Sequence, residues 1–147
     1  MVAMPDEEHF RKLERMYAGS PCSRSYGSSV KVARGEAEVR FPVRPELFHS
    51  GGALHGSAYF KALDDAAFFA ANSMVTGNLV LTTSFQIYLL RPVTSGEIRA
   101  VGRLLHKGRQ LLVAESVAFD ERGKTVARGS GTFTPSGPAL DADIGYR

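Results

Sequence analysis

The chain has 147 residues and a mass of 15.9 kDa, enough for one domain whose core needs no disulfide or metal to hold it together. Its content of 44% hydrophobic and 22% charged residues excludes a wholly disordered protein. The net charge of +3 arises from 18 basic and 15 acidic residues that are scattered rather than gathered in a block. We therefore expect a solvated surface and no nucleic-acid partner.

The sequence also indicates the cellular compartment in which the protein works. Its single cysteine, Cys22, cannot form an intramolecular disulfide, which suits a reducing environment. The acidic run at residues 6–8 stands where a secretory signal would be basic, and no apolar segment follows it. The longest apolar-rich stretch, residues 53–75, carries three charged side chains that would be costly inside a bilayer. We expect a cytoplasmic protein with no membrane partner.

The first 43 residues predict one helix followed by two strands. Within residues 1–20, apolar residues recur at helical spacing behind a proline and an acidic first turn, which complements the helix dipole. They are Phe10, Leu13 and Tyr17. Apolar and polar positions then alternate up to residue 43, as in half-buried strands, and a break near Arg34-Gly35 predicts a turn between the two.

A glycine-rich loop and a long helix come next. The loop, residues 49–53, contains adjacent glycines that destabilise regular structure and permit unusual dihedral angles. Residues 55–74 contain no proline, are rich in helix formers and are too many for a strand. Their apolar side chains spread around nearly the whole circumference, so we expect this helix to be buried on most sides.

Four β-rich segments follow the central helix, with short turns between them. They lie at about residues 79–91, 97–106, 110–120 and 124–134. Short connections favour antiparallel neighbours. One antiparallel sheet curled around the central helix satisfies this order. We therefore predict a single α+β domain over residues 1–147, with an irregular tail over residues 136–147.

Two adjacent carboxylates, Asp64 and Asp65, lie in this nearly apolar helix, where burial is costly unless each has a partner. Lys61 precedes Asp65 by one turn and can pair with it at the i,i+4 spacing. Lys61 is also three residues from Asp64, so spacing alone leaves the pairing open. Asp64 is the less explained carboxylate and the stronger candidate for chemistry.

The start of the helix is a second candidate feature. Gly56 follows the glycine-rich loop, and its backbone N–H lacks an intrahelical acceptor. That amide could stabilise the oxyanion that forms when a carbonyl is attacked. His49 and His55 flank the glycines, and either imidazole could donate a hydrogen bond to a substrate carbonyl or cap the local backbone.

Other chemistries have less support. Cys22, His9 and His106 show no metal-ligand spacing with the loop histidines, so we predict no metal. The chain has no Gly-x-Ser-x-Gly motif and no glycine-rich phosphate loop. Their absence argues against a serine triad and against nucleotide hydrolysis.

Residues 49–57, His-Ser-Gly-Gly-Ala-Leu-His-Gly-Ser, are followed by Asp64 nine positions after His55. This arrangement resembles the glycine motif and helix carboxylate of hotdog-fold acyl-CoA thioesterases, in particular the phenylacetate-pathway (PaaI-like) group. The likeness extends over about residues 26–135 and includes Leu-Arg-Pro at residues 90–92 and Gly-Ser-Gly-Thr-Phe at residues 129–133. It implies a hotdog fold, in which an antiparallel sheet wraps one long helix, and hydrolysis of acyl-CoA thioesters.

The resemblance also implies residue roles. Asp64 would be the nucleophile or general base, the Gly56 amide would form the oxyanion hole, and Thr82 would orient water. Ser57 stands where the family often has a second glycine, which leaves the preceding amide in place. His49 occupies the position of a frequent carbonyl-polarising asparagine, and an imidazole can donate as well. These groups suffice for thioester hydrolysis, so we expect no cofactor beyond the coenzyme A of the substrate.

The spacing of these groups has a geometric consequence. Gly56 and Asp64 are eight residues apart on one helix, so their backbones lie about 12 Å apart and one carbonyl does not readily meet both. A composite site would solve this, with Gly56 and His49 from one subunit and Asp64 and Thr82 from its twofold mate. We therefore expect a homodimer, in line with the family's habit of pairing two hotdogs, and a dimer of dimers as the larger assembly.

Substrate-binding candidates are less well defined. Phe60, Phe68 and Tyr88 could line an aromatic or an aliphatic acyl pocket, with His55 beside the carbonyl. Lys107 and Arg109 could meet the CoA phosphates. Two rival functions remain: a protein that binds acyl-CoA without turnover, which has no need of a buried carboxylate, and a dehydratase or hydratase on the same fold, which needs an acid/base pair at the acyl chain.

Overall fold

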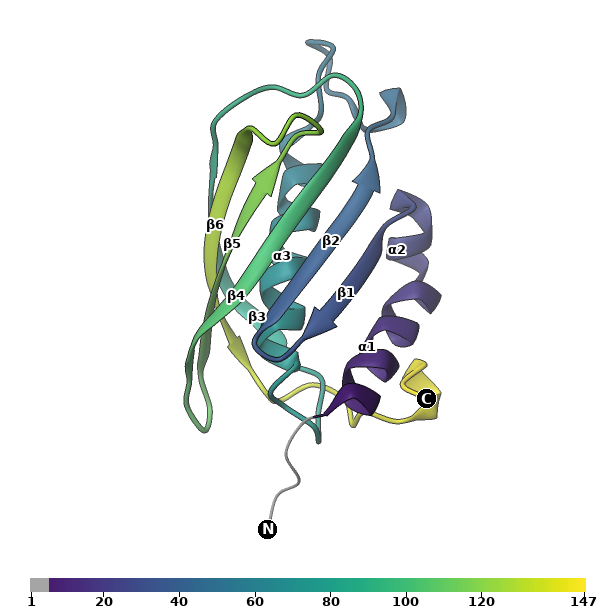
Figure 1. Cartoon of the computed structure of the whole chain (residues 1–147), viewed down its shortest axis with the longest axis vertical. Coiled ribbons are helices and arrows are strands. Elements are labelled where there is room, and N and C mark those ends of the chain that lie inside the picture. Colours follow the sequence, from purple (N-terminus) through teal and green to yellow (C-terminus); the bar gives the residue numbers. More distant parts are fainter. Residues whose placement is uncertain (1–5) are drawn as a thin grey trace.

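A computed structural model describes residues 6–147 of the chain and shows one six-stranded sheet with a long helix against it (Figure 1). In chain order the elements are α1 (Glu7–Gly19), α2 (Pro21–Tyr26), β1 (Ser29–Ala33), β2 (Glu36–Pro42), the 3-10 turn η1 (Pro45–Leu47), α3 (Gly56–Asn72), β3 (Leu81–Leu89), β4 (Glu97–Lys107), β5 (Leu112–Phe119), β6 (Thr125–Thr134) and the 3-10 turn η2 (Ala142–Ile144). The predicted α+β class is confirmed.

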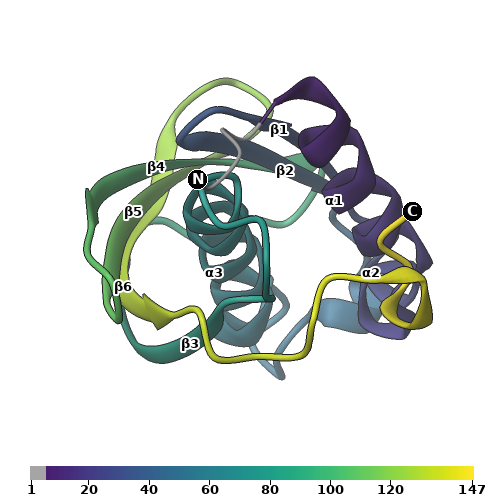
Figure 2. The ribbon, with the colours of Figure 1, turned by 90° about the horizontal axis from the view of Figure 1, so that it is seen from below.

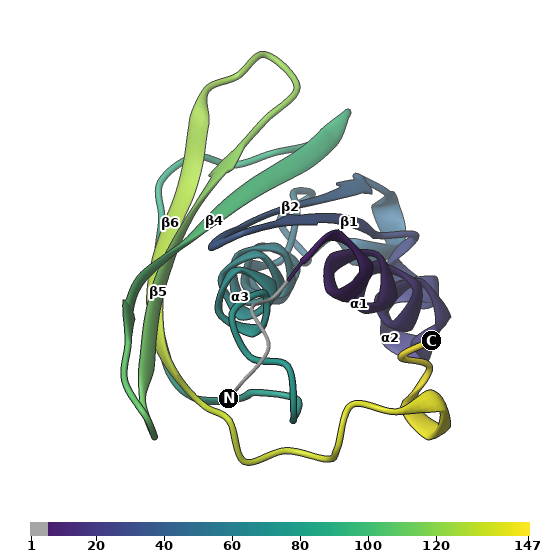
Figure 3. The same cartoon turned by 60° about the horizontal axis from the view of Figure 1, so that its bottom comes forward.

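The sheet is antiparallel throughout and has the strand order β1-β2-β4-β5-β6-β3. It curls around α3, which Figures 2 and 3 show end-on inside the curve. The expectation that short connections join neighbours is wrong for β3 and β4, because β3 pairs with β6 instead. The connecting residues 90–96 cross the N-terminal end of α3, where the Leu54 N–H donates to the carbonyl of the buried Val93.

Small side chains bring α3 close to the sheet. Ala62, Ala66 and Ala70 are fully buried, as the predicted all-round apolarity of this helix requires. Gly102 of β4 lies directly against the helix, and a Cβ on it would be 2.1 Å from the Ala66 carbonyl oxygen. The Ser116 hydroxyl of β5 donates to the Leu63 carbonyl at 2.8 Å. The helix is therefore held tightly on its sheet side.

The two leading helices pack beside β1 and α3. The predicted first helix is confirmed as α1, with Asp6 as its N-cap, whereas Pro5 lies outside the described residues. The second helix, α2, was not predicted. Its capping signals are present, since Ser20 is the N-cap, Pro21 opens the first turn and Gly27 ends the helix with φ +68°. Six residues are too few to show an apolar period, which is why the pattern did not reveal it.

The last residues are irregular, as predicted, except for the turn η2. They fold back across the molecule onto α1 (Figure 2). His9 of α1 anchors them, because its Nε2 donates to the Asn72 carbonyl at 2.9 Å and its Nδ1 accepts from the Tyr146 hydroxyl at 2.7 Å. None of the helices in residues 6–147 is long and apolar enough to cross a membrane.

Candidate functional site

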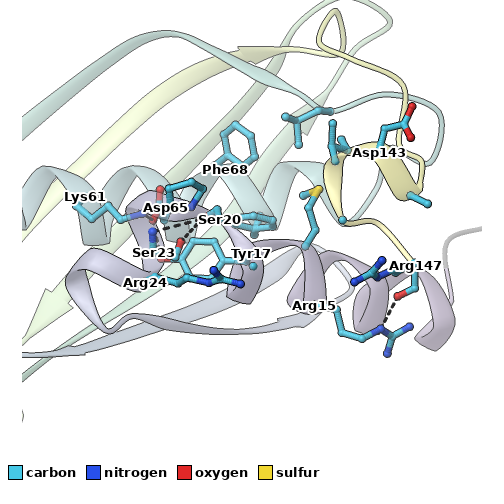
Figure 4. Close-up of a pocket in the computed structure, with 18 of the residues that line it drawn as sticks. Arg15, Tyr17, Ser20, Ser23, Arg24, Lys61, Asp65, Phe68, Asp143 and Arg147 are labelled. Carbon is cyan, nitrogen blue, oxygen red and sulfur yellow. Dashed lines mark hydrogen bonds and ion pairs between the residues drawn. The ribbon is translucent and has the colours of Figure 1, made fainter.

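Asp64 lies near the middle of α3, is half-buried, and lines a groove of about 790 Å³. Figure 4 shows this groove, with the neighbouring Lys61, Asp65 and Phe68 of α3 labelled. A hydrogen bond from β3 holds its side chain: the Thr82 hydroxyl donates to Asp64 Oδ1 at 2.8 Å. Because that hydroxyl donates its own proton to the carboxylate, its oxygen lone pairs can still accept a hydrogen bond. The structure thus brings together two of the four residues to which the sequence assigned catalytic roles.

A β-bulge in β3 aims Thr82 at the helix. The register against β6 shifts between Thr82 and Ser84, so Thr83 is the extra residue. Phe85 and Ile87 are less exposed than their neighbours, as expected for inward-facing positions two residues apart, and regular alternation would place residue 83 inward with them. The bulge reverses this phase and puts Thr82 inward instead. Without it the Thr82 hydroxyl would face away from Asp64.

Asp65 is accounted for by partners other than Asp64. Lys61 Nζ lies 2.6 Å from Asp65 Oδ2, which confirms the i,i+4 pair, and the Tyr17 hydroxyl of α1 donates to the same oxygen at 2.7 Å. Lys61 also lies 4.9 Å from the centre of the Tyr17 ring. Burial raises the pKa of Asp65, while Lys61 and Tyr17 oppose the rise. Asp65 therefore has a structural role that Asp64 lacks.

The environment of Asp64 suits a general base. Burial raises its pKa to about 6; the Thr82 hydrogen bond and the Lys61 charge oppose this rise, and the Asp65 charge adds to it. A base with a pKa near the working pH is deprotonated often enough to act and basic enough to take a proton. If the carboxylate is the active form, activity falls as the pH drops through about 6.

We call this fall in activity at low pH the acid limb of the pH profile. Removing a negative charge beside Asp64 and removing a positive charge beside it are expected to move the acid limb in opposite directions. Asp65→Asn removes a negative charge and frees Lys61 to act on Asp64, so the Asp64 pKa falls and activity persists to lower pH. Lys61→Met removes the positive charge, so the limb moves to higher pH. Profiles of kcat/KM against pH for the three proteins test this, and unchanged profiles would mean that Asp64 does not set the limb.

The groups predicted to polarise the carbonyl lie elsewhere, in a smaller hollow of about 240 Å³ at the N-terminus of α3. His49, Gly56, Leu89 and Pro92 are among the residues that line it. In the described part of the chain no acceptor takes the Gly56 N–H, which leaves this first amide of the helix able to bind a substrate oxygen.

The two loop histidines differ in what they do. His55 is the N-cap of α3, and its Nδ1 accepts from the Ser57 N–H at 3.0 Å, so capping is its observed role. His49 Nδ1 accepts from the Gly51 N–H at 2.9 Å. Because Nδ1 is an acceptor, the neutral ring carries its proton on Nε2, which can donate outward. A Cβ on Gly51 would lie 2.8 Å from His49 Cε1, so this ring position needs glycine there.

The predicted substrate-binding residues are spread over the molecule. Phe68 lines the Asp64 groove. Phe60 of α3 and Tyr88 of β3 are exposed, and the Phe60 ring lies edge-on to the Phe85 ring of β3. Lys107 and Arg109 lie exposed at the turn between β4 and β5. Across the sheet, Lys107 of β4 is paired with Leu112 of β5, which is paired with Phe133 of β6, which is paired with Thr82 of β3. Three strand spacings therefore separate Lys107 from Thr82, a distance of about 14 Å.

Within residues 6–147 no three His, Cys, Asp or Glu side chains gather as a metal site would require. Both candidate regions are instead built from backbone amides, a carboxylate, a hydroxyl and an imidazole. This set can polarise a carbonyl and activate water.

Comparison with known proteins identifies the family. A sequence profile of the Thioesterase superfamily matches residues 51–127, more than half of the chain. The chain belongs to the thioesterase superfamily. The proofreading thioesterase EntH of Klebsiella pneumoniae is 34% identical over 97 residues, which cover 65% of this chain and 70% of that protein.

Solved structures show the same fold. The conserved protein PA5202 from Pseudomonas aeruginosa is 35% identical, with a TM-score of 0.76 over 82% of this chain and 97% of that one. The E. coli PaaI protein from the phenylacetic acid degradation operon has a TM-score of 0.83 over 92% of this chain and 98% of that one. At 23% identity the second likeness shows the fold alone. The predicted hotdog fold is confirmed.

In this thioesterase-superfamily chain the Asp64 groove also has walls that the sequence did not predict. Tyr17, Ser20 and Arg24 come from the two leading helices, and Asp143 and Ile144 come from η2. They are far from the glycine motif in sequence and form no motif of their own. Only the packing of both ends of the chain against α3 reveals them.

Proposed function

We propose that this chain hydrolyses acyl-CoA thioesters to the free acid and coenzyme A, with Asp64 as general base. The contact between Asp64 and Thr82 carries the proposal, because it pairs a carboxylate of raised pKa with a hydroxyl able to hold water. Superfamily membership supports thioester hydrolysis as the general reaction. The acyl-CoA substrate is the finer part of the proposal.

In the proposed reaction the Thr82 oxygen accepts a hydrogen bond from a water molecule. This water attacks the thioester carbonyl carbon while Asp64 takes a proton from the water. The carbonyl oxygen becomes an oxyanion, stabilised by the Gly56 N–H and by a hydrogen bond from His49 Nε2. Collapse of this intermediate breaks the carbon–sulfur bond. The proton on Asp64 passes to the leaving thiolate, which restores the base, and no cofactor takes part.

The separation of the two candidate regions supports a composite site. Asp64 and Thr82 lie in one groove and Gly56 and His49 in another, about 12 Å away along α3 by helix rise. A second copy of the chain must then supply one half. The free edge of β3 offers a place for it, because among residues 6–147 β3 pairs with β6 alone and ends the sheet.

Exposed apolar residues gather along this edge. Five of the seven large exposed hydrophobic residues among those described lie on β3 or beside it: Phe60, Leu81, Tyr88, Leu89 and Leu90. Tyr88 is 59% exposed and Leu89 is 52% exposed. An unpaired strand edge with an apolar border favours pairing with another chain. We therefore propose a homodimer in which two copies of β3 pair.

Antiparallel pairing of two β3 strands would complete the site. Thr82 lies at the start of β3, and Leu89 at its end is beside Gly56, since a Cβ on Gly56 would be 3.1 Å from Leu89 Cδ1. In an antiparallel pair the start of one strand faces the end of the other. Asp64 of one subunit would then meet Gly56 of its mate. Association of two such dimers into a tetramer is part of the same proposal.

A proline at position 56 tests the oxyanion donor. Proline is tolerated at the first position of a helix, and His55 already has a compatible ψ of 147°, so Gly56→Pro removes the N–H with little backbone change. We expect kcat to fall by about 10²–10³-fold, as for loss of one oxyanion donor. Hydrolysis of an acyl-CoA panel, followed by release of the CoA thiol, measures this.

Gly56→Ala is the matched control, because it adds the same Cβ beside Leu89 but keeps the N–H. It is expected to retain most activity. Equal losses in the two variants at equal thermal stability would show that crowding, not the lost donor, causes the effect. Wild-type activity in Gly56→Pro would exclude this amide from the reaction.

A further inference from the structure

The fold leaves one aromatic side chain of α3 uncovered. Phe60 is 40% exposed, and among the described residues of α3 it is the one large hydrophobic residue with such exposure. It lies four residues after Gly56 and four before Asp64, and residues spaced by four share a face of a helix. The face of α3 that carries both proposed catalytic groups therefore has an exposed ring at its midpoint.

The Phe60 ring is supported on one side by β3. It meets the Phe85 ring edge to face, with the ring centroids 5.6 Å apart and the planes at 86°. Two glycines of β6 make room for Phe85, because a Cβ on Gly129 or Gly131 would lie 2.5 or 2.4 Å from its ring. This packing fixes the position of the Phe60 ring and leaves the rest of its surface exposed.

A composite site determines where the twofold axis of the dimer passes along α3. If Asp64 of one subunit faces Gly56 of its mate, symmetry makes Gly56 of the first subunit face Asp64 of the mate. The two copies of α3 then run antiparallel. The residue midway between these positions, Phe60, faces its own copy.

The same symmetry places the axis on β3. Antiparallel pairing that sets Thr82 opposite Leu89 of the mate has its midpoint between Phe85 and Gln86. A single axis passes both midpoints only if they are neighbours within each subunit. The ring contact between Phe60 and Phe85 meets this requirement.

The two active sites of such a dimer lie about 12 Å apart along the paired helices, with Phe60 between them. At each site the gap between the helices must admit a thioester carbonyl and a water molecule. Without a bulky side chain at the midpoint, this gap would continue from one site to the other. Two apolar rings buried there would close it, and their burial would stabilise the dimer.

We propose that Phe60 packs against Phe60 of a second copy of this chain at the twofold axis, and that this aromatic pair is the wall between the two active sites. The inference rests on the proposed function, because the composite site sets the axis. Each active site would then receive Phe60 from both subunits.

Cysteine cross-linking tests the position of the axis. In a Cys22→Ser background, which removes the single cysteine of the chain, bismaleimidoethane should join Phe60→Cys to its own copy and give a covalent dimer in denaturing electrophoresis. Tyr88→Cys is the matched control. Tyr88 is more exposed, at 59%, but its two copies would lie about 17 Å apart across the axis. It should react with a monofunctional maleimide and give no covalent dimer.

Phe60→Ala tests how much the ring contributes to the dimer. The change removes two rings from one interface, so the dimer Kd from analytical ultracentrifugation should rise by about tenfold or more, the scale for loss of an interface hot spot. Leu105→Ala is the control. Leu105 is 49% exposed on β4, which lies inside the sheet rather than at the β3 edge, and its truncation should leave the Kd unchanged.

Three results would overturn the inference: a wild type that stays monomeric, a folded Phe60→Cys protein that gives no covalent dimer, or equal rises in Kd for Phe60→Ala and Leu105→Ala. If thermal unfolding shows that Phe60→Cys is not folded, the dissociation constants decide. None of these measurements depends on catalysis. Failure of the proposed function would appear instead as absent acyl-CoA hydrolysis in a protein that cross-links as expected.

Discussion

Asp64→Asn is expected to lower kcat by about two or more orders of magnitude with little change in KM, the scale of loss for a general base. Asparagine keeps the size of the side chain and can still contact Thr82, but it cannot take a proton from water. Steady-state hydrolysis of the preferred acyl-CoA measures the effect.

Asp65→Asn is the matched control, because it makes the same chemical change on the adjacent helix position, where the carboxylate is bound to Lys61 and Tyr17. It should lose far less kcat. The reverse ranking would transfer the role of base to Asp65, and full turnover by Asp64→Asn would remove the proposed mechanism.

The same variant separates an enzyme from a protein that only binds acyl-CoA. Asp64→Asn should bind its substrate with a Kd close to that of the wild type, because the carboxylate acts on water rather than on the acyl group. Wild-type protein that binds acyl-CoA in calorimetry yet releases no CoA thiol would favour the binding function instead.

Mixing two inactive variants is expected to restore activity. In a composite site, Asp64 and Gly56 of one chain serve different active sites, so Asp64→Asn and Gly56→Pro each inactivate both sites of a homodimer. A mixed dimer has one site with both defects and one with neither. With random assortment half of the dimers are mixed and half of their sites are intact, so activity should approach about a quarter of the wild-type value.

The experiment unfolds and refolds an equimolar mixture of the two variants, with each variant refolded alone as the control. Differently tagged chains report whether mixed dimers have formed. If they form and the mixture stays as inactive as its parents, Asp64 and Gly56 serve the same site from one chain. The proposed active site across the β3 edge would then be wrong.

Much of the fold could be predicted because the signals are local. The long proline-free apolar run determined α3, and alternation with glycine turns determined the strands to within a few residues. The i,i+4 spacing of Lys61 and Asp65 also indicated their ion pair, since helical geometry alone brings them together. Because this pair accounts for Asp65, the sequence could rank Asp64 above Asp65 as the candidate catalytic carboxylate.

What only the tertiary structure decided depends on contacts between distant segments. Whether β3 pairs with β4 or β6 is a choice between similar strand edges, and the requirement to enclose α3 settles it. The inward aim of Thr82 depends on a bulge opposite β6, which no alternation in β3 itself reveals. The groove beside Asp64 is lined by residues of α3, of the leading helices and of η2, which come from opposite ends of the chain, and α2 and η2 are too short to show a period. The sequence thus determined which elements form, and packing between them determined where the candidate chemistry lies.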